Sequence, residues 1–294
     1  MLIMELKKYA DIAFDQFGGL ALELVPHFQD FNMTLNKANI KLSLPEYIAL
    51  SIGFVFTTTL FVFTLFGTLF VLSSGLSGLL TAFTLSLVVA IFSTGITYIF
   101  PVLKVSNRAS VIRDMLPFAV MYLSTLAGTG SSVAEMFENL SKVDEYGEVS
   151  EEAAKIHRDI DTFGMDVNEA LIRGAERTPS EDFEELLRGM EHILTTGGSV
   201  REFLRERAAK LMDDYERRIE KFSDQLSLLV EMYITIVVVG SIIFTAMSAI
   251  MSSFTGFAPG FIVALQAVLI FIGLPIISGM FILFIKGIAP GGSM

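Results

Sequence analysis

The chain has 294 residues, no cysteine, 52% hydrophobic residues, a mean hydropathy of +0.61 and a formal net charge of −11. The lack of cysteine excludes a disulfide framework and a thiolate metal site, and the acidic balance argues against a nucleic-acid-binding surface. No Asp, Glu, Lys or Arg occurs between Glu46 and Lys104, or between Glu231 and Lys286. This distribution of charge predicts a protein that crosses a membrane several times.

The first 43 residues are predicted to form an amphipathic helical segment. Apolar residues recur there at helical spacing, at Leu2, Leu6, Tyr9, Ile12, Ala13 and Phe17. Acidic residues interrupt the apolar pattern, so the segment does not read as a signal peptide. We expect a helix that packs on the membrane or on the central block, and the alternative is a dedicated partner site.

Each charge-free stretch is more than 50 residues long, which is room for two crossings of ~20 residues. Segments rich in Ser and Gly, at residues 73–78 and 252–260, are predicted to be turns. Each turn divides one charge-free stretch into two spans. Continuous Leu, Phe, Val and Ile runs favour helices, because a barrel needs alternating apolar and polar residues. The expected spans cover residues 47–72, 79–103, 228–251 and 261–285.

Lys and Arg flank the predicted spans on one side of the membrane only. They precede the first and third spans and follow the second and fourth, and both turns lack them. These residues are Lys37, Lys41, Lys104, Arg108, Arg113, Arg217, Arg218, Lys221 and Lys286. By the positive-inside rule we expect a multi-pass protein of the cytoplasmic (inner) membrane, with both termini and the central block in the cytoplasm.

Residues 104–225 carry 16 basic and 25 acidic side chains and are long enough for a small domain. Capping-box spacing, which marks helix starts, occurs at Ser132–Glu135, Asp166–Glu169, Thr178–Glu181 and Ser199–Glu202. Glycines at 128, 130, 147, 164, 197 and 198 supply breaks. Six helices are expected, at about 114–127, 132–143, 151–163, 167–176, 179–196 and from 200 onward.

The expected fold class is all-α: a polytopic membrane protein with four transmembrane helices and one cytoplasmic six-helix bundle. The expected divisions are an amphipathic segment, a transmembrane hairpin, a cytoplasmic module, a second hairpin and a tail. They cover residues 1–43, 44–103, 104–225, 226–286 and 287–294.

Neither Gly nor Pro occurs between Ser199 and Val239. One continuous helix is therefore expected to join the module to the third span, and 40 residues at ~1.5 Å each make it about 60 Å long. Such a helix could transmit a tilt or a rotation. The alternative is a helix that bends or breaks near Ser223 and only tethers the module.

Several short motifs accompany this order of parts. The module opens with Leu116-Pro117-Phe118, followed by a segment that ends in Gly128-Thr129-Gly130. Later motifs are Phe163-Gly164-Met165-Asp166, Thr178-Pro179-Ser180 with Phe183, and Thr195-Thr196-Gly197-Gly198-Ser199. Glu231 and Tyr233 stand at the mouth of the third span.

Topology and motifs together resemble the inner-membrane platform proteins of type II secretion systems, type IV pili, Tad pili and the archaellum. The likeness covers about residues 45–290 and points to the single-module archaeal or Tad-like branch. Two departures are the position of Gly189-Met190-Glu191, which stands earlier than the family's Gly-Glu pair, and the presence of one module where many relatives carry two.

The resemblance implies a non-enzymatic platform without cofactors that assembles a type IV pilus-like filament or a secretion pseudopilus. The implied partners are a hexameric secretion ATPase, pilin-like subunits, the lipid bilayer, and a second copy or a related single-module protein in a dimer; nucleic acid is not among them. Alternatives are a membrane signalling adaptor and a small transporter subunit. Structural or interaction candidates are Gly128, Gly130, Gly164, Pro179, Gly197, Gly198, Glu231 and Tyr233.

Catalytic chemistry finds little support in the sequence. His27, His157 and His192 lie in no metal-binding motif, and no phosphate-binding loop occurs. Glu231 is expected either to lie in headgroup water or to fix the third span against a neighbour or a partner by a salt bridge or hydrogen bond. Two acidic clusters, 145–152 and 181–185, are expected to be either solvated surfaces or docking sites for a basic patch of the ATPase.

Overall fold

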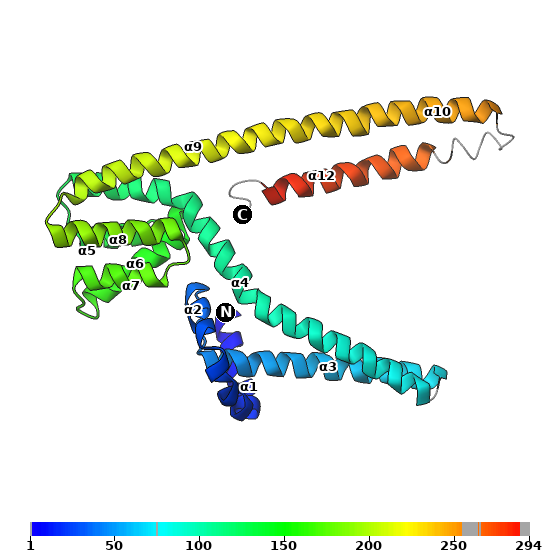
Figure 1. Cartoon of the computed structure of the whole chain (residues 1–294), viewed down its shortest axis with the longest axis horizontal. Helices are drawn as coiled ribbons and strands as arrows, with labels where there is room; N and C mark the ends of the chain where they lie inside the picture. Colours follow the sequence, from blue (N-terminus) through cyan, green and yellow to red (C-terminus); the bar gives the residue numbers. More distant parts are fainter. Residues whose placement is uncertain (1, 75, 255–263, 265, 289–294) are drawn as a thin grey trace. The chain divides into compact units, whose positions relative to one another are not determined.

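The computed structural model describes residues 2–74, 76–254, 264 and 266–288 (Figure 1). Every regular element in these ranges is helical, which confirms the predicted all-α class. Four helical stretches are long and apolar enough to cross a membrane, as predicted: Leu44–Leu69, Leu80–Gly128, Val200–Ile250 and Gln266–Lys286. By its internal contacts the chain divides into two compact units, Met1–Leu116 with Leu126–Phe203 and Pro117–Thr125 with Leu204–Met294.

The first unit begins with α1 (Leu2–Leu24), a 3-10 turn (Val25–His27) and α2 (Gln29–Lys37), which pack against the start of α3 (Leu44–Ser74). The Glu46 carboxylate accepts a hydrogen bond from the Ser43 backbone N–H at 2.8 Å and so stabilises the first turn of α3. A small apolar core fixes the packing, formed by Ala21, Leu35, Leu44, Tyr47, Ile48 and Ala49. The predicted N-terminal helix is therefore present, and α1 packs on the start of α3, which differs from the expected packing on the central block.

The first hairpin pairs α3 with α4 (Leu76–Gly128). The Tyr47 hydroxyl donates a hydrogen bond to the Thr97 carbonyl at 2.6 Å, and the rings of Phe31 and Tyr98 stack at 5.4 Å. The predicted turn at 73–78 is shorter than expected, since α3 ends at Ser74 and α4 begins at Leu76; Gly75 lies outside the described residues.

A separate helix beginning near residue 114 was expected, and this expectation is wrong. α4 is one helix of 53 residues that carries the second span onward into the central module. Its prolines at 101 and 117 each remove one backbone hydrogen bond, and the rest of the ladder continues past them.

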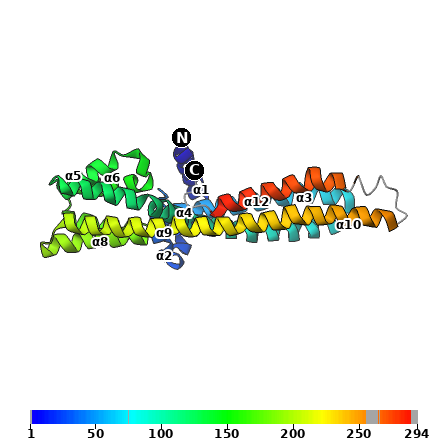
Figure 2. The same ribbon diagram turned by 90° about the horizontal axis from the view of Figure 1, so that it is seen from above.

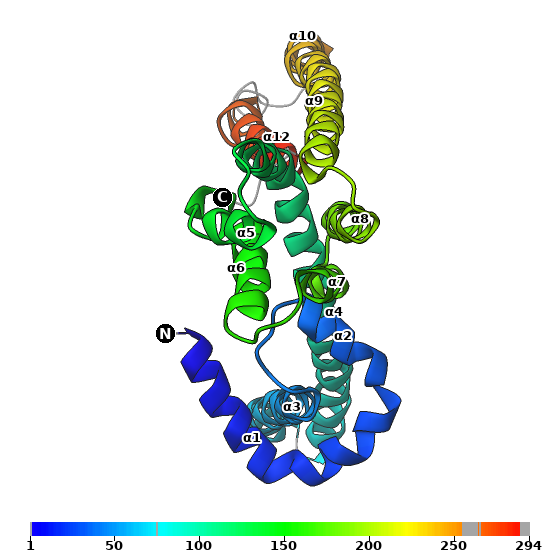
Figure 3. The ribbon, with the colours of Figure 1, turned by 90° about the vertical axis from the view of Figure 1, so that its left-hand side faces the viewer.

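Four short helices form a bundle beyond α4, named here the short-helix bundle (Figure 3). They are α5 (Val133–Ser141), α6 (Glu148–Asp161), α7 (Val167–Arg177) and α8 (Glu181–Thr196). Apolar side chains three and four residues apart line the inner face of each helix. The fully buried set includes Phe137, Leu140, Ile156, Leu171, Phe183 and Leu187.

The ends of these helices follow the predicted capping residues in part. Asp166 caps α7, but it accepts the Asn168 backbone N–H at 3.0 Å in place of the predicted box with Glu169. Ser132 and Glu135 form the full capping box, with bonds of 3.3 and 2.9 Å. The predicted box from Thr178 to Glu181 is wrong, because Ser180 caps α8 by accepting the Phe183 backbone N–H. Pro179 consequently lies in the connection before the cap, not at the first helical position.

The second unit contains most of α9 (Val200–Tyr233), which continues through a π-helical segment (Ile234–Val239) into α10 (Gly240–Phe254) (Figure 2). The predicted continuous helix is confirmed, and no break occurs near Ser223. The fourth span comprises a π-helical segment (Leu269–Gly273) and α12 (Leu274–Ile288). The predicted turn at 252–260 and the C-terminal tail lie mostly outside the described residues.

Candidate functional site

Arg108 is the centre of a buried ion cluster in the first unit. Its side chain is only 4% exposed although it projects from α4, a largely apolar helix. Its guanidinium donates to the Glu148 carboxylate at 2.6 and 2.8 Å and to the Glu152 carboxylate at 2.9 Å. A further bond of 2.5 Å reaches the Lys37 backbone carbonyl. One side chain thus joins α4, α6 and the end of α2.

Glu152 is the most buried carboxylate of the cluster, with its side chain 1% exposed. Besides Arg108, it accepts from Lys155 at 2.8 Å and from Arg177 of α7 at 3.3 Å. Burial alone would raise the pKa of Glu152, but Lys155, Arg108 and Arg177 together outweigh it and hold that pKa below its ordinary value. Glu152 is therefore an ionised carboxylate surrounded by three cations.

The cluster continues along the interface of α6 and α7. Arg177 also donates to Asp159 at 3.1 Å, and Arg173 approaches the same carboxylate at 3.9 Å. Asn39, just after α2, donates to Glu151 and accepts from Lys155, both at 3.2 Å. Through these contacts the N-terminal segment is fixed directly to the short-helix bundle.

The depressed pKa of Glu152 predicts how the cluster responds to acid. A carboxylate with a lowered folded-state pKa stabilises the fold above its unfolded pKa of about 4.3, and loses that contribution as the pH falls through the folded-state value. We expect Glu152→Gln to lower the unfolding midpoint at pH 7 and to match the wild type at strongly acidic pH. Thermal unfolding of both proteins in detergent measures these midpoints. A difference between the two midpoints that is the same at both pH values would contradict the prediction.

The first acidic cluster, 145–152, is only partly a surface. Glu148 and Glu152 turn into the ion cluster, and Glu152 has no access to a partner. The second cluster, 181–185, keeps its carboxylates on the outside of α8, where Asp182 pairs with Arg113 at 3.6 Å and Glu184 with Arg188 at 2.9 Å. Both clusters therefore keep exposed carboxylates, Glu145 and Glu151 in the first and Glu181 and Glu185 in the second.

The predicted glycines lie at helix ends, where the backbone requires them. Gly130, Gly164 and Gly197 have φ values of +83°, +65° and +76°, a region that side chains disfavour. Gly197 ends α8, and the Gly198 N–H donates to the Ile193 carbonyl at 2.9 Å, as in a Schellman motif. These three positive-φ glycines set the connections between short helices and do not converge on one site.

Gly128 has a more specific role at the end of α4. The Arg201 guanidinium, from the first turn of α9, donates to the Gly128 carbonyl at 2.7 Å and to the Ala127 carbonyl at 3.2 Å. Carbonyls at a helix C-terminus lack intrahelical partners, so a cation satisfies both their hydrogen bonding and the helix dipole. The end of one long helix is thereby fixed to the start of the other.

The two candidates at the mouth of the third span differ in their surroundings. The Tyr233 hydroxyl shares a hydrogen bond of 2.8 Å with Ser278, and its ring stacks on Phe281 at 4.6 Å, so Tyr233 joins the third and fourth spans. Glu231 is exposed and forms no ion pair or hydrogen bond within the described part of the chain. Among the described residues, therefore, none fixes the third span through Glu231.

The comparisons with known proteins agree with the predicted resemblance. The family model of type II secretion system (T2SS), protein F, matches residues 119–248. Three Methanocaldococcus jannaschii proteins are similar: flagella accessory protein J, 27% identical over 54% of this chain, and two uncharacterised proteins, 28% and 30% identical over 46% and 35%.

The matched segments cover 28%, 23% and 30% of those three relatives, so the chain spans less than a third of their length. No solved structure matches the chain. The matched residues begin within α4 and extend through the short-helix bundle and α9 into α10. Residues 119–248 of the chain are therefore similar to protein F of type II secretion systems.

Proposed function

We propose that the chain is an assembly platform in the cytoplasmic membrane, which couples a hexameric secretion ATPase to pilin-like subunits of a filament or pseudopilus. One observation carries the proposal: α4 and α9 are each a single helix shared between a candidate span and the central module. The similarity to protein F and to flagella accessory protein J supports the same role.

The proposed mechanism is mechanical. The ATPase moves the short-helix bundle in the cytoplasm, and α9 carries the movement to subunits in the bilayer. Because a helix resists bending over tens of ångströms, a displacement at one end reaches the other. The hydrogen bonds from Arg201 to the end of α4 support joint movement of both long helices.

The docking surface for the ATPase is proposed on the outer side of α8, at residues 181–185. We expect Glu181→Lys with Glu185→Lys to abolish ATPase retention in a pull-down at low salt, because a basic partner patch is then repelled. High salt should weaken wild-type binding, since exposed charges are screened.

The matched control is Asp161→Lys with Glu169→Lys, which makes the same change of charge at exposed positions of α6 and α7. This control should retain the ATPase. Equal loss in both double variants would assign the effect to net charge and contradict a specific docking surface.

The proposed second copy, or a related single-module protein, is expected to contact Glu231. An exposed carboxylate at the membrane boundary has no partner among the described residues, and such a group gains most from a partner supplied by another subunit. We expect Glu231→Gln to reduce filament output while membrane insertion stays intact. Filament counts and membrane fractionation check this, and unchanged output would contradict the role.

A further inference from the structure

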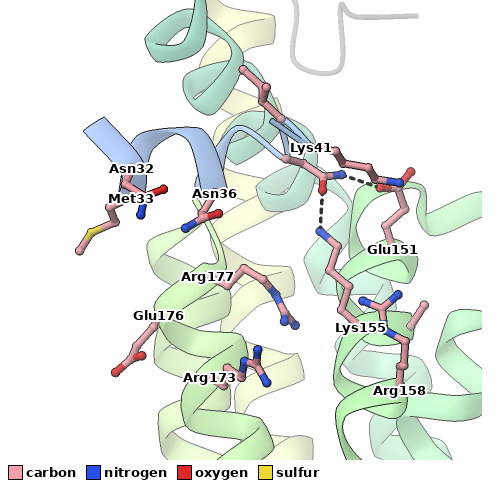
Figure 4. A pocket seen from close by; sticks show the side chains of 13 residues that line it. Asn32, Met33, Asn36, Lys41, Glu151, Lys155, Arg158, Arg173, Glu176 and Arg177 are labelled. Carbon is pink, nitrogen blue, oxygen red and sulfur yellow. Dashed lines mark hydrogen bonds between the residues drawn. The ribbon is translucent and has the colours of Figure 1, made fainter. Parts of the chain in front are cut away.

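A pocket of about 860 Å³ lies in the first unit beside the buried ion cluster. α2, the segment after it, α6 and α7 line this pocket, and Figure 4 shows Arg173 and Arg177 of α7 reaching towards Lys155 and Arg158 of α6. With Lys41, five cationic side chains and only two carboxylates line it. In a chain with a net charge of −11, this is a local concentration of positive charge.

Several hydrogen-bond donors of this pocket have no acceptor in the part of the chain that the structure describes. The side chains of Lys41, Arg158 and Asn36 form no ion pair or hydrogen bond with any described residue. The Nη2 atom of Arg177 is buried and also lacks a partner. A buried donor without an acceptor destabilises the fold by about 1–3 kcal/mol. An acceptor bound in the pocket would remove this cost for the Arg177 Nη2 atom.

The carboxylates near the pocket do not fill this need. Glu151 is engaged by the Asn39 side chain at 3.2 Å, and Figure 4 shows Glu176 pointing away from the gap between the two helices. Glu152 and Asp159 of the ion cluster do not line the pocket, but they partly neutralise its cations Lys155, Arg173 and Arg177. Lys41, Arg158 and the free nitrogen of Arg177 remain for a ligand.

One edge of the pocket, at Lys41, lies close to the start of the first candidate span. Lys41 is three residues before α3, whose candidate span begins at Leu44. Three residues of extended chain reach at most about 10 Å, and a headgroup layer is roughly 5–8 Å deep. Lys41 is therefore within reach of lipid phosphates in the leaflet where the first candidate span begins.

We propose that this pocket binds a phosphate group, supplied by an anionic glycerophospholipid of the surrounding membrane. Arginine forks match phosphate oxygens in a bidentate manner, and the lysine adds a point charge. The bound headgroup would join α6, α7 and the segment before the first span. This inference does not depend on coupling to an ATPase.

The test measures the unfolding midpoint of the full chain in neutral detergent. Phosphatidylglycerol, phosphatidylcholine and inorganic phosphate are each added at constant ionic strength. A ligand that binds only the folded protein raises the midpoint. The pocket variant is Lys41→Gln with Arg158→Gln, and the control is Lys142→Gln with Arg188→Gln, which removes the same charge from exposed i,i+4 pairs.

We expect phosphatidylglycerol to raise the midpoint of the wild type and the control by several degrees, and to leave the pocket variant unchanged. Arg158→Gln alone removes a cation outside the ion cluster and should lose part of the shift without destabilising the free protein. A shift with inorganic phosphate but not with the lipid would support the site with a soluble source. An equal response of all variants, or no response of the wild type to either probe, would overturn the proposal.

Discussion

Arg108→Met is expected to lower the free energy of unfolding of the first unit by about 3 kcal/mol. Removing one partner of a buried ion pair typically costs 3–5 kcal/mol, because the remaining charge is left without compensation. Glu148 would lose its only ion-pair partner among the described residues, and Glu152 would keep Lys155 and Arg177. The lower end of the range is therefore expected.

The substitution also removes the bond from Arg108 to the Lys37 carbonyl, so the N-terminal segment should detach more easily. Denaturant unfolding in detergent measures the stability, and limited proteolysis between residues 25 and 42 measures the detachment. The control is Arg188→Met, which removes the same charge from an exposed pair with Glu184 and should cost less than about 1 kcal/mol.

A double-mutant cycle separates the ion cluster from general effects of the substitution. Arg108→Met combined with Glu148→Gln should cost less than the sum of the two single changes, since each removes a partner of the other. Strict additivity, or equal costs for Arg108→Met and Arg188→Met, would show that the buried cluster does not stabilise this unit.

The hydrophobic and charge patterns predicted most of the architecture. The four spans, the α5–α8 bundle and the unbroken α9 follow from charge-free stretches, capping residues and the absence of Gly and Pro. The continuity of α4 was missed, because the second span was expected to end with the charge-free stretch at residue 103 and a new helix to begin near residue 114. A proline interrupts a helix only locally, and a long apolar helix can retain its remaining hydrogen bonds.

The ion cluster could not be predicted because its members lie far apart in the sequence. Arg108 and Glu152 are brought together by the packing of α6 on α4, which no local pattern specifies. One signal was available: Glu148, Glu152, Lys155 and Asp159 repeat at helical spacing on the face that also carries the buried Ile156. Charges on an apolar face indicate buried pairs and not a solvated surface.

Glu220→Pro is expected to abolish filament assembly or secretion while leaving the two ends of α9 folded. Glu220 is exposed and lies between the buried positions Leu204–Leu211 and the third span. A proline there removes one backbone hydrogen bond, clashes with the preceding turn and costs about 3 kcal/mol locally. The resulting kink would absorb a movement that the straight helix transmits.

The matched control, Glu220→Ala, removes the same charge but favours the helix and should assemble filaments normally. Both variants should insert into the membrane and retain the ATPase in pull-downs, which separates transmission from docking. Normal assembly by the proline variant would show that α9 is only a tether.

The most direct measurement is filament or secretion output in the source organism after deletion of this chain. The platform role predicts that output falls to background and is restored by the wild type but not by Glu220→Pro. Normal filaments and normal secretion in the deletion strain would contradict the proposed platform role itself.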